Sequence, residues 1–262
     1  MTSLRKYIYG PVYSWRMGMS LGIDPVADHE KICNLDCVYC QLGRTKTLTE
    51  NRAIFVKTAE LIEEIKAIPA GTKVDYLTFS GRGEPTLALN LGAMIHTLKK
   101  VRPEPVAVIT NSTLLHQKDV CLDLQQADYV LAKLDVGTQQ CFEKIDVPGS
   151  VNFSKIIDGL LQFREMYTGQ FALQIMLMEE NFDQVIDLSH IARLIDPDEV
   201  QLNTPTRPCG IQPLDAAKIE EAKSYFNGLQ VSGVYDKPVK PYEPWDAVAT
   251  KRRHGNYVRK RF

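Results

Sequence analysis

Three cysteines lie close together near the start of the sequence, in the stretch C-N-L-D-C-V-Y-C. Thiolates are ligands for soft metals, and three of them at this spacing repel one another unless a cation lies between them. They can hold three irons of a four-iron–four-sulfur cluster. Because no fourth cysteine follows nearby, one iron would remain open to a cofactor or substrate. The flanking residues are typical of a loop, which can wrap a cluster. We therefore predict that Cys33, Cys37 and Cys40, in a loop over residues 29–44, are metal ligands.

Two other interpretations of these cysteines are open at this stage. They could be ordinary buried thiols, although their density argues against that interpretation. They could instead bind zinc, since His29 lies four residues before Cys33 and would complete a tetrahedral site with the three thiolates. The protein would then be a non-catalytic zinc or iron–sulfur binding module rather than an enzyme.

The cysteine spacing, with Tyr39 directly before the last cysteine, resembles the signature of the radical S-adenosylmethionine (radical SAM) superfamily. The flanks, residues 10–24 and 38–45, narrow the resemblance to a bacterial and archaeal branch that is loosely similar to the enzymes forming the wyosine base of tRNA. The likeness runs from about Gly10 to Pro208. It implies that a one-electron donor of flavodoxin or ferredoxin type reduces the cluster, which cleaves SAM to methionine and a 5′-deoxyadenosyl radical that abstracts hydrogen from a substrate. It also implies that Tyr39 packs against the adenine of SAM.

A glycine-rich turn, G-R-G-E-P, follows a strand that we predict over residues 74–80. Taken alone, it is a tight turn with a solvated glutamate. Its glycines also allow the backbone to approach a ligand closely. The resemblance implies that Gly83 and Glu84 bind the cofactor, with the Glu84 carboxylate pairing with the ammonium group of SAM. Many family members have two adjacent glycines before this glutamate. Arg82 intervenes here, which makes Gly81 a weaker candidate for a contact.

Two further strands carry polar residues. In the segment Y-V-L-A-K-L-D-V the side chains alternate, so Lys133 and Asp135 share one face. A lysine and an aspartate in an apolar strand are costly to bury unless they are paired. They are therefore either a structural ion pair or, as the resemblance implies, contacts to the carboxylate and ribose of SAM. Thr110 and Asn111 end another apolar strand, where they are either turn residues or contacts to the cofactor.

The remaining candidates carry weaker signals. Cys121 and Cys141 lie in or near predicted helices, where a free cysteine behaves as a small hydrophobe. Cys209 follows T-P-T-R-P at a strand end and is our candidate for a catalytic thiol, with packing as the alternative. Four polar residues that lie in the family-like N-terminal segment or interrupt apolar strands have no role that the sequence resolves: Ser14, Arg16, Gln174 and Asn203.

The elements that must position these residues alternate between strand-like and helix-like segments. Counting a first strand over residues 19–23, the sequence contains six β/α units, which predict a parallel sheet with right-handed crossovers. Six units are fewer than the eight of a closed barrel. We therefore predict an α/β fold with an open, partial (β/α)6 barrel and helices outside, which is also the fold that the resemblance implies. The cysteine loop and the polar turns fall at the carboxyl ends of the strands, where such sheets place their sites.

The composition, with 44% hydrophobic and 24% charged residues, is that of a soluble globular protein. We find no apolar run approaching the ~18 residues of a membrane span, and no signal-peptide core, so we expect no membrane partner. Six cysteines without a regular framework predict a reducing, cytoplasmic location.

The chain is predicted to have two parts. A radical SAM partial barrel spans residues 1–228, and a Pro-rich extended segment with a basic tail spans residues 229–262. The last stretch, residues 251–262, carries six Lys/Arg and no acidic residue. It could bind RNA, dock onto the acidic body of the same molecule or stay solvated. The sequence does not specify the substrate, and an RNA base, a protein and a small metabolite are all compatible with it.

Overall fold

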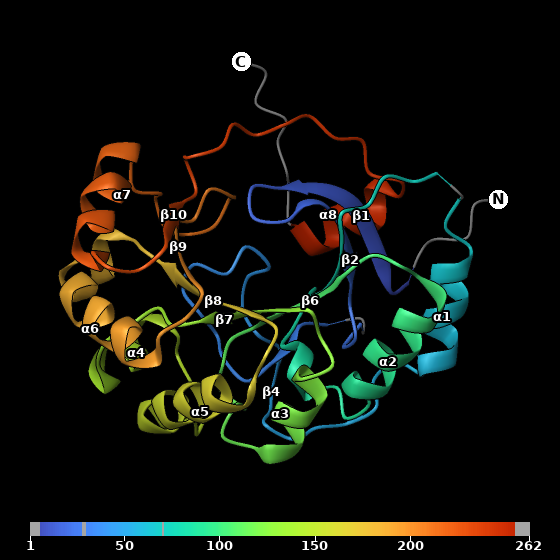
Figure 1. The fold of residues 1–262 in the computed structure, drawn as a ribbon, viewed down its shortest axis with the longest axis horizontal. Coiled ribbons are helices and arrows are strands. Elements are labelled where there is room, and N and C mark those ends of the chain that lie inside the picture. Colours follow the sequence, from blue (N-terminus) through green and yellow to red (C-terminus); the bar gives the residue numbers. More distant parts are fainter. Residues whose placement is uncertain (1–5, 28–29, 70, 255–262) are drawn as a thin grey trace.

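Eight strands form one curled sheet that is parallel except at one edge (Figure 1). We describe it from a computed structural model that covers residues 6–27, 30–69 and 71–254. The six strands of the predicted β/α units lie side by side in chain order: β2 (Gly18–Ile23), β5 (Tyr76–Phe79), β6 (Val106–Thr110), β7 (Tyr129–Lys133), β8 (Gln170–Met176) and β9 (Glu199–Asn203). The prediction of a partial (β/α)6 barrel is confirmed.

Each edge of the sheet carries one strand beyond these six. β1 (Ile8–Ser14) forms an antiparallel hairpin with β2, and β10 (Val231–Gly233) runs parallel to β9. A separate two-stranded sheet pairs β3 (Ile32–Cys33) with β4 (Thr47–Leu48) and ties down the cysteine loop.

Seven helices of the described part of the chain lie along the convex outside of the sheet (Figure 1). They follow the strands as the β/α pattern requires, with apolar faces turned to the sheet, and three short 3-10 helices join them. The helices are α1 (Thr58–Lys66), α2 (Leu91–Val101), α3 (Lys118–Leu124), α4 (Gln139–Ile145), α5 (Phe153–Met166), α6 (Val185–Ile195) and α7 (Ala216–Lys223). The 3-10 helices are η1 (Pro85–Leu87), η2 (Glu179–Gln184) and η3 (Ser224–Phe226).

The strand side chains alternate between two apolar environments. In β7, Val130 and Ala132 pack into the main core between sheet and helices, whereas Tyr129 and Leu131 pack inside the barrel. A small apolar cluster inside the barrel joins these two residues to others that lie early in their strands or in the β1–β2 turn: Met17, Ala107 and Ala172. The lumen is therefore filled toward the amino ends of the strands, and the space that remains lies toward their carboxyl ends.

The C-terminal part differs from the extended segment and tail that the sequence suggested. It adds β10 to the sheet and ends in a helix, α8 (Ala247–His254), beside β1. Between the two elements, the chain runs across the open side of the curled sheet (Figure 1). The amide of Trp245 donates to the carbonyl of Gly10 at 2.7 Å, and the Gly10 amide donates to the Thr250 hydroxyl at 2.9 Å. Residues 255–262 of the predicted tail lie outside the described residues.

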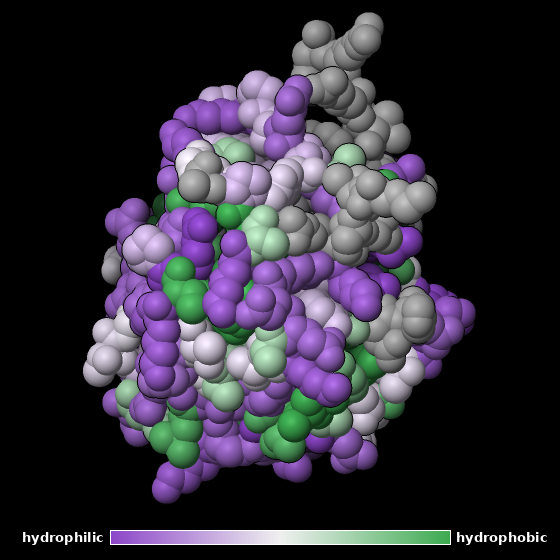
Figure 2. Space-filling view, turned by 90° about the vertical axis from the view of Figure 1, so that its right-hand side faces the viewer, coloured by the Kyte–Doolittle hydropathy of each residue, from purple (hydrophilic) through white to green (hydrophobic). Residues whose placement is uncertain are grey.

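The face that Figure 2 turns to the viewer is predominantly hydrophilic, and its hydrophobic residues form small separate patches. Among the described residues, none of the helices combines the length and apolar character that crossing a membrane requires.

Candidate active site

The cysteine loop is fixed by its own backbone and by a few polar side chains. The amide of Cys40 donates to the Cys37 carbonyl at 3.0 Å, and the amide of Gly43 donates to the Cys40 carbonyl at 2.9 Å. The Lys31 ammonium donates to the Gly43 carbonyl at 2.9 Å, and Asp36 accepts from the Thr45 amide at 2.6 Å. These turns give the loop conformation that the sequence predicted.

The three cysteines of the loop are partly buried free thiols. Burial raises the pKa of the Cys33 thiol to about 11, and the charge of Cys40 acts in the same direction. Burial also raises the pKa of the Cys37 thiol, with a smaller contribution from Cys33. Cys33 therefore lies within electrostatic reach of both other cysteines, and a bound metal would favour the thiolate forms. In the part of the chain that is described, no three Cys, His, Asp or Glu side chains converge into a preformed metal site. His29, the fourth ligand of the zinc alternative, lies outside that part.

Gly83 lets the turn before η1 lie directly against the cysteine loop. A Cβ atom at Gly83 would lie 1.8 Å from the carbonyl oxygen of Ile32. Because that oxygen belongs to the backbone, it cannot move aside to relieve the clash. The amide of Glu84 donates to the same carbonyl at 3.3 Å. Glycine is required at position 81 for a different reason. Its φ of +132° is strained for other residues, and a Cβ atom added there would lie 2.5 Å from the Asp24 side chain. The glycines of the turn thus hold Glu84 beside the cysteines.

The Glu84 carboxylate is buried rather than solvated, with the residue only 3% exposed. Oε1 accepts from the amide of Thr86 at 3.1 Å and from the hydroxyls of Thr86 and Thr110, each at 2.7 Å. Oε2 accepts from the amide of Asn111 at 2.7 Å. Burial raises the pKa of Glu84, and these donors work against that shift. The solvated turn glutamate, which was one of the two interpretations, does not describe this carboxylate.

Asn111 joins the cysteine loop to the Glu84 carboxylate. Its backbone amide donates to Glu84, while its side-chain amide donates to Asn34 Oδ1 at 2.7 Å and to Cys33 Sγ at 3.8 Å. Thr110 lies behind Glu84 and holds the carboxylate through its hydroxyl. The strand end that the sequence described as either a turn or a cofactor contact therefore links two parts of the candidate site.

Tyr39, Lys133 and Asp135 meet in a second polar cluster on the other side of the loop. The Lys133 ammonium lies 2.8 Å from Asp135 Oδ2 and 4.3 Å from the centre of the Tyr39 ring, and the Tyr39 hydroxyl bonds to both partners. Asp135 Oδ1 accepts from the Met176 amide at 2.7 Å. Although burial lowers the pKa of Lys133, the carboxylate of Asp135 raises it, and the net shift is upward. The ion pair, one of the two interpretations of the sequence, is present.

Asp146 belongs to this cluster and was missed in the sequence. It is 4% exposed and accepts from the Tyr39 hydroxyl at 3.2 Å. Burial, together with the nearby Asp135, raises its pKa to about 7. Asp146 follows α4 in a loop without any motif, so only the folded chain brings it to Tyr39.

A cavity of about 320 Å³ lies inside the barrel next to these groups. Gln174, Asn203 and Arg16 line it, so the two polar strand residues do face the lumen. Tyr39 lines both this cavity and a smaller pocket that is shared with Asn111, Lys133 and Asp135. The larger cavity therefore lies directly beside the cluster of Tyr39, Lys133 and Asp135.

Cys209 does not line the cavity. Its thiol donates to the Ile211 carbonyl at 3.4 Å, and its side chain packs against the main core. This position favours packing over a catalytic role. We expect Cys209→Ser to retain SAM cleavage and product formation close to those of the wild type, because the substituted atom keeps its acceptor. Quantification of 5′-deoxyadenosine and of product tests this, and a variant that cleaves SAM but forms no product would restore the catalytic assignment.

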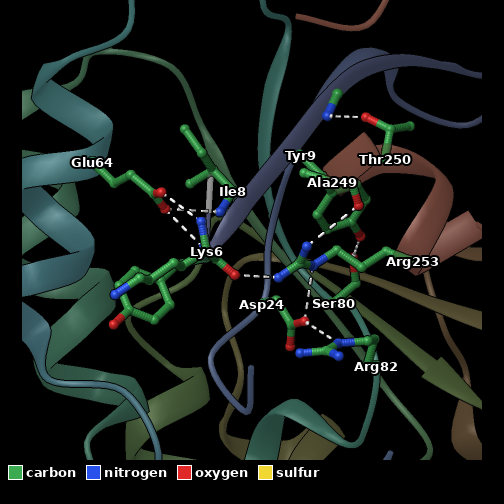
Figure 3. A network of polar contacts seen from close by, with 12 residues as sticks. Lys6, Ile8, Tyr9, Asp24, Glu64, Ser80, Arg82, Ala249, Thr250 and Arg253 are labelled. Atoms are coloured by element: carbon green, nitrogen blue, oxygen red, sulfur yellow. Dashed lines mark hydrogen bonds and ion pairs between the residues drawn. The ribbon is translucent and has the colours of Figure 1, made fainter. Parts of the chain in front are cut away.

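Asp24 and Arg253 form a buried ion pair (Figure 3), and Arg253 also lines the cavity. Arg253 Nε donates to Asp24 Oδ2 at 2.9 Å, and Arg82 Nε lies 3.5 Å from the same oxygen. Arg253 also donates to the carbonyls of Lys6 and Ala249. Three interpretations of the basic tail were open: RNA binding, docking onto the same molecule and a solvated terminus. Arg253 docks onto the body of the molecule. Lys251 and Arg252 of the same helix are exposed.

The Radical SAM superfamily model matches residues 29–191, more than half of the chain, including the three cysteines and Glu84. The chain belongs to the radical SAM superfamily. Membership implies a four-iron–four-sulfur cluster and SAM.

Two relatives each align with most of this chain. A UPF0026 protein of Synechocystis sp. is 40% identical over 208 residues, which cover 78% of this chain and 77% of the relative. The protein named GTPase Obg of Brachyspira hyodysenteriae is 36% identical over 245 residues, which cover 88% of this chain but 36% of that relative, so the chain spans about a third of its length.

The chain shares its fold with TYW1, one of the wyosine-forming enzymes to which the branch indicated by the cysteine flanks is loosely similar. The solved structure of TYW1 with a lysine–pyruvate adduct bound superposes with a TM-score of 0.65 at 16% identity, covering 82% of this chain and 76% of that one. At this identity the likeness is one of fold.

Proposed function

We propose that this protein is a radical SAM enzyme that acts on a substrate held in the lumen of the partial barrel. The observation that carries the proposal is the Asn111 link: the backbone amide of this residue bonds the buried Glu84 carboxylate, and its side chain bonds the loop of three thiols. Three thiolates and an open position, beside a carboxylate for an ammonium group, match what a cluster that binds SAM requires. When bound, these groups would supply a 5′-deoxyadenosyl radical for hydrogen abstraction.

The residues of the chain would hold and orient the cofactor. Cys33, Cys37 and Cys40 are the proposed cluster ligands. Glu84 Oε2 has one amide donor and retains acceptor capacity for the ammonium group of SAM. The proposed role of Lys133 and Asp135, which line the smaller pocket with Tyr39, is to contact the carboxylate and ribose. Thr110 acts by fixing Glu84, and Gly83 by allowing the loop and the turn to touch.

The partners of the enzyme follow from this chemistry. Each reductive cleavage of SAM consumes one electron, so we propose a flavodoxin or ferredoxin type donor. The proposal of an RNA substrate rests on the basic tail alone. The burial of Arg253 against Asp24 removes one of the tail's six cations from the surface that would contact phosphate.

The test is anaerobic purification or reconstitution with iron and sulfide, followed by reduction with dithionite in the presence of SAM. We expect a brown protein with broad absorbance near ~400 nm, and formation of 5′-deoxyadenosine and methionine. A colourless protein that retains one zinc and forms neither product would instead support the non-catalytic module.

Glu84→Gln is expected to weaken SAM binding about 10- to 150-fold, the effect of losing one charge-assisted hydrogen bond of about 1.5–3 kcal/mol. Calorimetric titration of the reconstituted protein with SAM measures this. Iron content should stay at the wild-type level, since the hydrogen bond from Glu84 to the described part of the loop is made by its backbone amide. Glu63→Gln, on α1 with a side chain that is 72% exposed, is the matched control. Unchanged affinity in Glu84→Gln would reduce Glu84 to a capping residue of η1.

A further inference from the structure

The lumen cavity has an unusual balance of charge. Three arginines line it, namely Arg16 from the β1–β2 turn, Arg207 from the segment after β9 and Arg253 from α8. Among the described residues that line it, none is acidic. The cysteines and Glu84 are not part of this lining, and Tyr39 separates it from the smaller pocket that holds Lys133. The cationic cavity is thus adjacent to the proposed cofactor residues but distinct from them.

The three arginines differ in how their charges are balanced. Arg253 is paired with the buried Asp24, and Arg207 Nη1 donates to the Gln41 side-chain oxygen at 3.0 Å. Arg16 has neutral partners. With the Gln174 amide turned so that its oxygen faces Arg16, that oxygen accepts from Nε at 2.9 Å and from Nη2, and the guanidinium lies 4.5 Å from the centre of the Trp15 ring.

No carboxylate of the described residues lies within ion-pair distance of Arg16. Glu199 acts on it only through space, and that carboxylate already accepts from Gln201 at 2.8 Å and from Ser232. Burial lowers the pKa of Arg16 to about 10, and Arg207 contributes to the shift. A partly buried guanidinium without a carboxylate close by is costly, and an anionic ligand would reduce that cost.

We propose that Arg16, supported by Arg207, binds an oxyanion of the substrate, so that this enzyme acts on a small molecule carrying a phosphate or carboxylate group. The Gln174 side chain accepts from Nε and Nη2 of Arg16, which fixes the plane of the guanidinium. The Nη1 hydrogens are then available to an acceptor on a ligand. Arginine is suited to this role because its fork matches two oxygens of a phosphate or carboxylate. This inference rests on the proposed function, since it assigns the lumen to the substrate of that reaction.

The test measures anion binding without turnover. Reconstituted protein that is saturated with SAM and kept free of reductant is titrated calorimetrically with inorganic phosphate and, separately, with malonate at constant ionic strength. We expect one anion to bind, and Arg16→Ala to weaken that binding about 10- to 150-fold. Arg16→Lys keeps the charge but loses the fork of the guanidinium, so its affinity for the anion should lie between those of the wild type and Arg16→Ala. Arg164→Ala removes a partly exposed arginine of α5 that pairs with Asp198 outside the cavity, and it should bind like the wild type.

Each outcome decides the proposal. Preference for phosphate assigns a phosphoryl substrate, and preference for malonate assigns a carboxylate. No binding of either anion, or equal binding by the wild type and Arg16→Ala, overturns the proposal. If Arg16→Ala does not fold, an Arg16→Lys variant that binds the anion with wild-type affinity overturns the proposal that the guanidinium fork of Arg16 recognises it. The same titration is repeated without SAM, and an anion that binds only to the SAM-free protein would assign Arg16 to the cofactor instead. A protein that cleaves SAM but binds neither anion fails this inference alone, whereas Arg16-dependent binding without any SAM cleavage fails the proposed function.

Discussion

Replacing any one of Cys33, Cys37 or Cys40 with alanine is expected to remove most of the bound iron and all cleavage of SAM. Three thiolates leave no redundancy in a cluster that keeps one iron open. The other cysteines cannot substitute, since Cys121 lies buried in α3 and Cys209 packs against the core. Iron and sulfide analysis, absorbance near ~400 nm and quantification of 5′-deoxyadenosine measure the effect on each variant.

The matched control is Cys141→Ala. Cys141 is a partly buried free thiol in α4, outside the cysteine loop, and its loss should leave iron content and SAM cleavage unchanged. A full cluster with normal turnover in any single loop variant would show that the ligands are assigned wrongly. Zinc in place of iron in the wild type, lost equally in all three variants, would support the zinc alternative.

The fold was predictable because its signals are local. Alternating apolar strands and helices are written in the sequence at short range, and their repetition predicts a parallel, right-handed β/α sheet. The extra edge elements carry weaker signals. β10 is three residues long, and α8 is a short helix with a strongly polar composition, so neither has a periodicity that stands out. Both depend on tertiary contacts with β9 and β1.

The candidate site was predictable where a motif marks it and not where only the fold does. The cysteines and Glu84 stand in recognisable spacings, and the alternation of β7 placed Lys133 and Asp135 together. The role of Asn111 as a link could not be read, because Cys33 and Glu84 lie far from it in the sequence. Asp146 has no motif at all.

The ion pair of Asp24 and Arg253 likewise could not be predicted, because the two residues are distant in the sequence. They are 229 positions apart, and neither has a neighbour in the sequence that predicts a partner. The basic tail was visible only as a run of charge, for which a surface role is the ordinary expectation. Its buried arginine becomes evident only because the C-terminal segment crosses the open side of the sheet (Figure 1).

Arg253→Ala is expected to destabilise the protein by about 3–5 kcal/mol near neutral pH, the typical effect of leaving one partner of a buried ion pair uncompensated. Asp24 is fully buried and Arg253 is 3% exposed. The carboxylate is already poorly satisfied, since no described residue bonds Oδ1. After the substitution the carboxylate would keep its contacts with Arg82, whose Nε lies 3.5 Å from Oδ2. The urea unfolding midpoint of the anaerobically purified holoprotein measures the change.

The pH dependence of this loss has a defined sign. Burial raises the pKa of Asp24 in the folded protein above its usual value, and Arg253 works against that shift. Without Arg253 the folded pKa should rise further while the unfolded value stays near ~3.9. A raised folded pKa contributes stability below the unfolded pKa and loses it as the pH rises through the folded value. The difference between wild type and Arg253→Ala should therefore grow as the pH rises from about 4 toward neutrality.

Two comparisons separate the ion pair from other effects of changing α8. Arg252→Ala removes an exposed cation from the same helix and should stay within about 0.5 kcal/mol of the wild type. Asp24→Asn in the Arg253→Ala background removes the uncompensated charge and should recover part of the lost stability, flattening the pH dependence. A loss below about 1 kcal/mol in Arg253→Ala at neutral pH, or a loss that does not change with pH, would mean that α8 docks through its apolar contacts and backbone bonds instead.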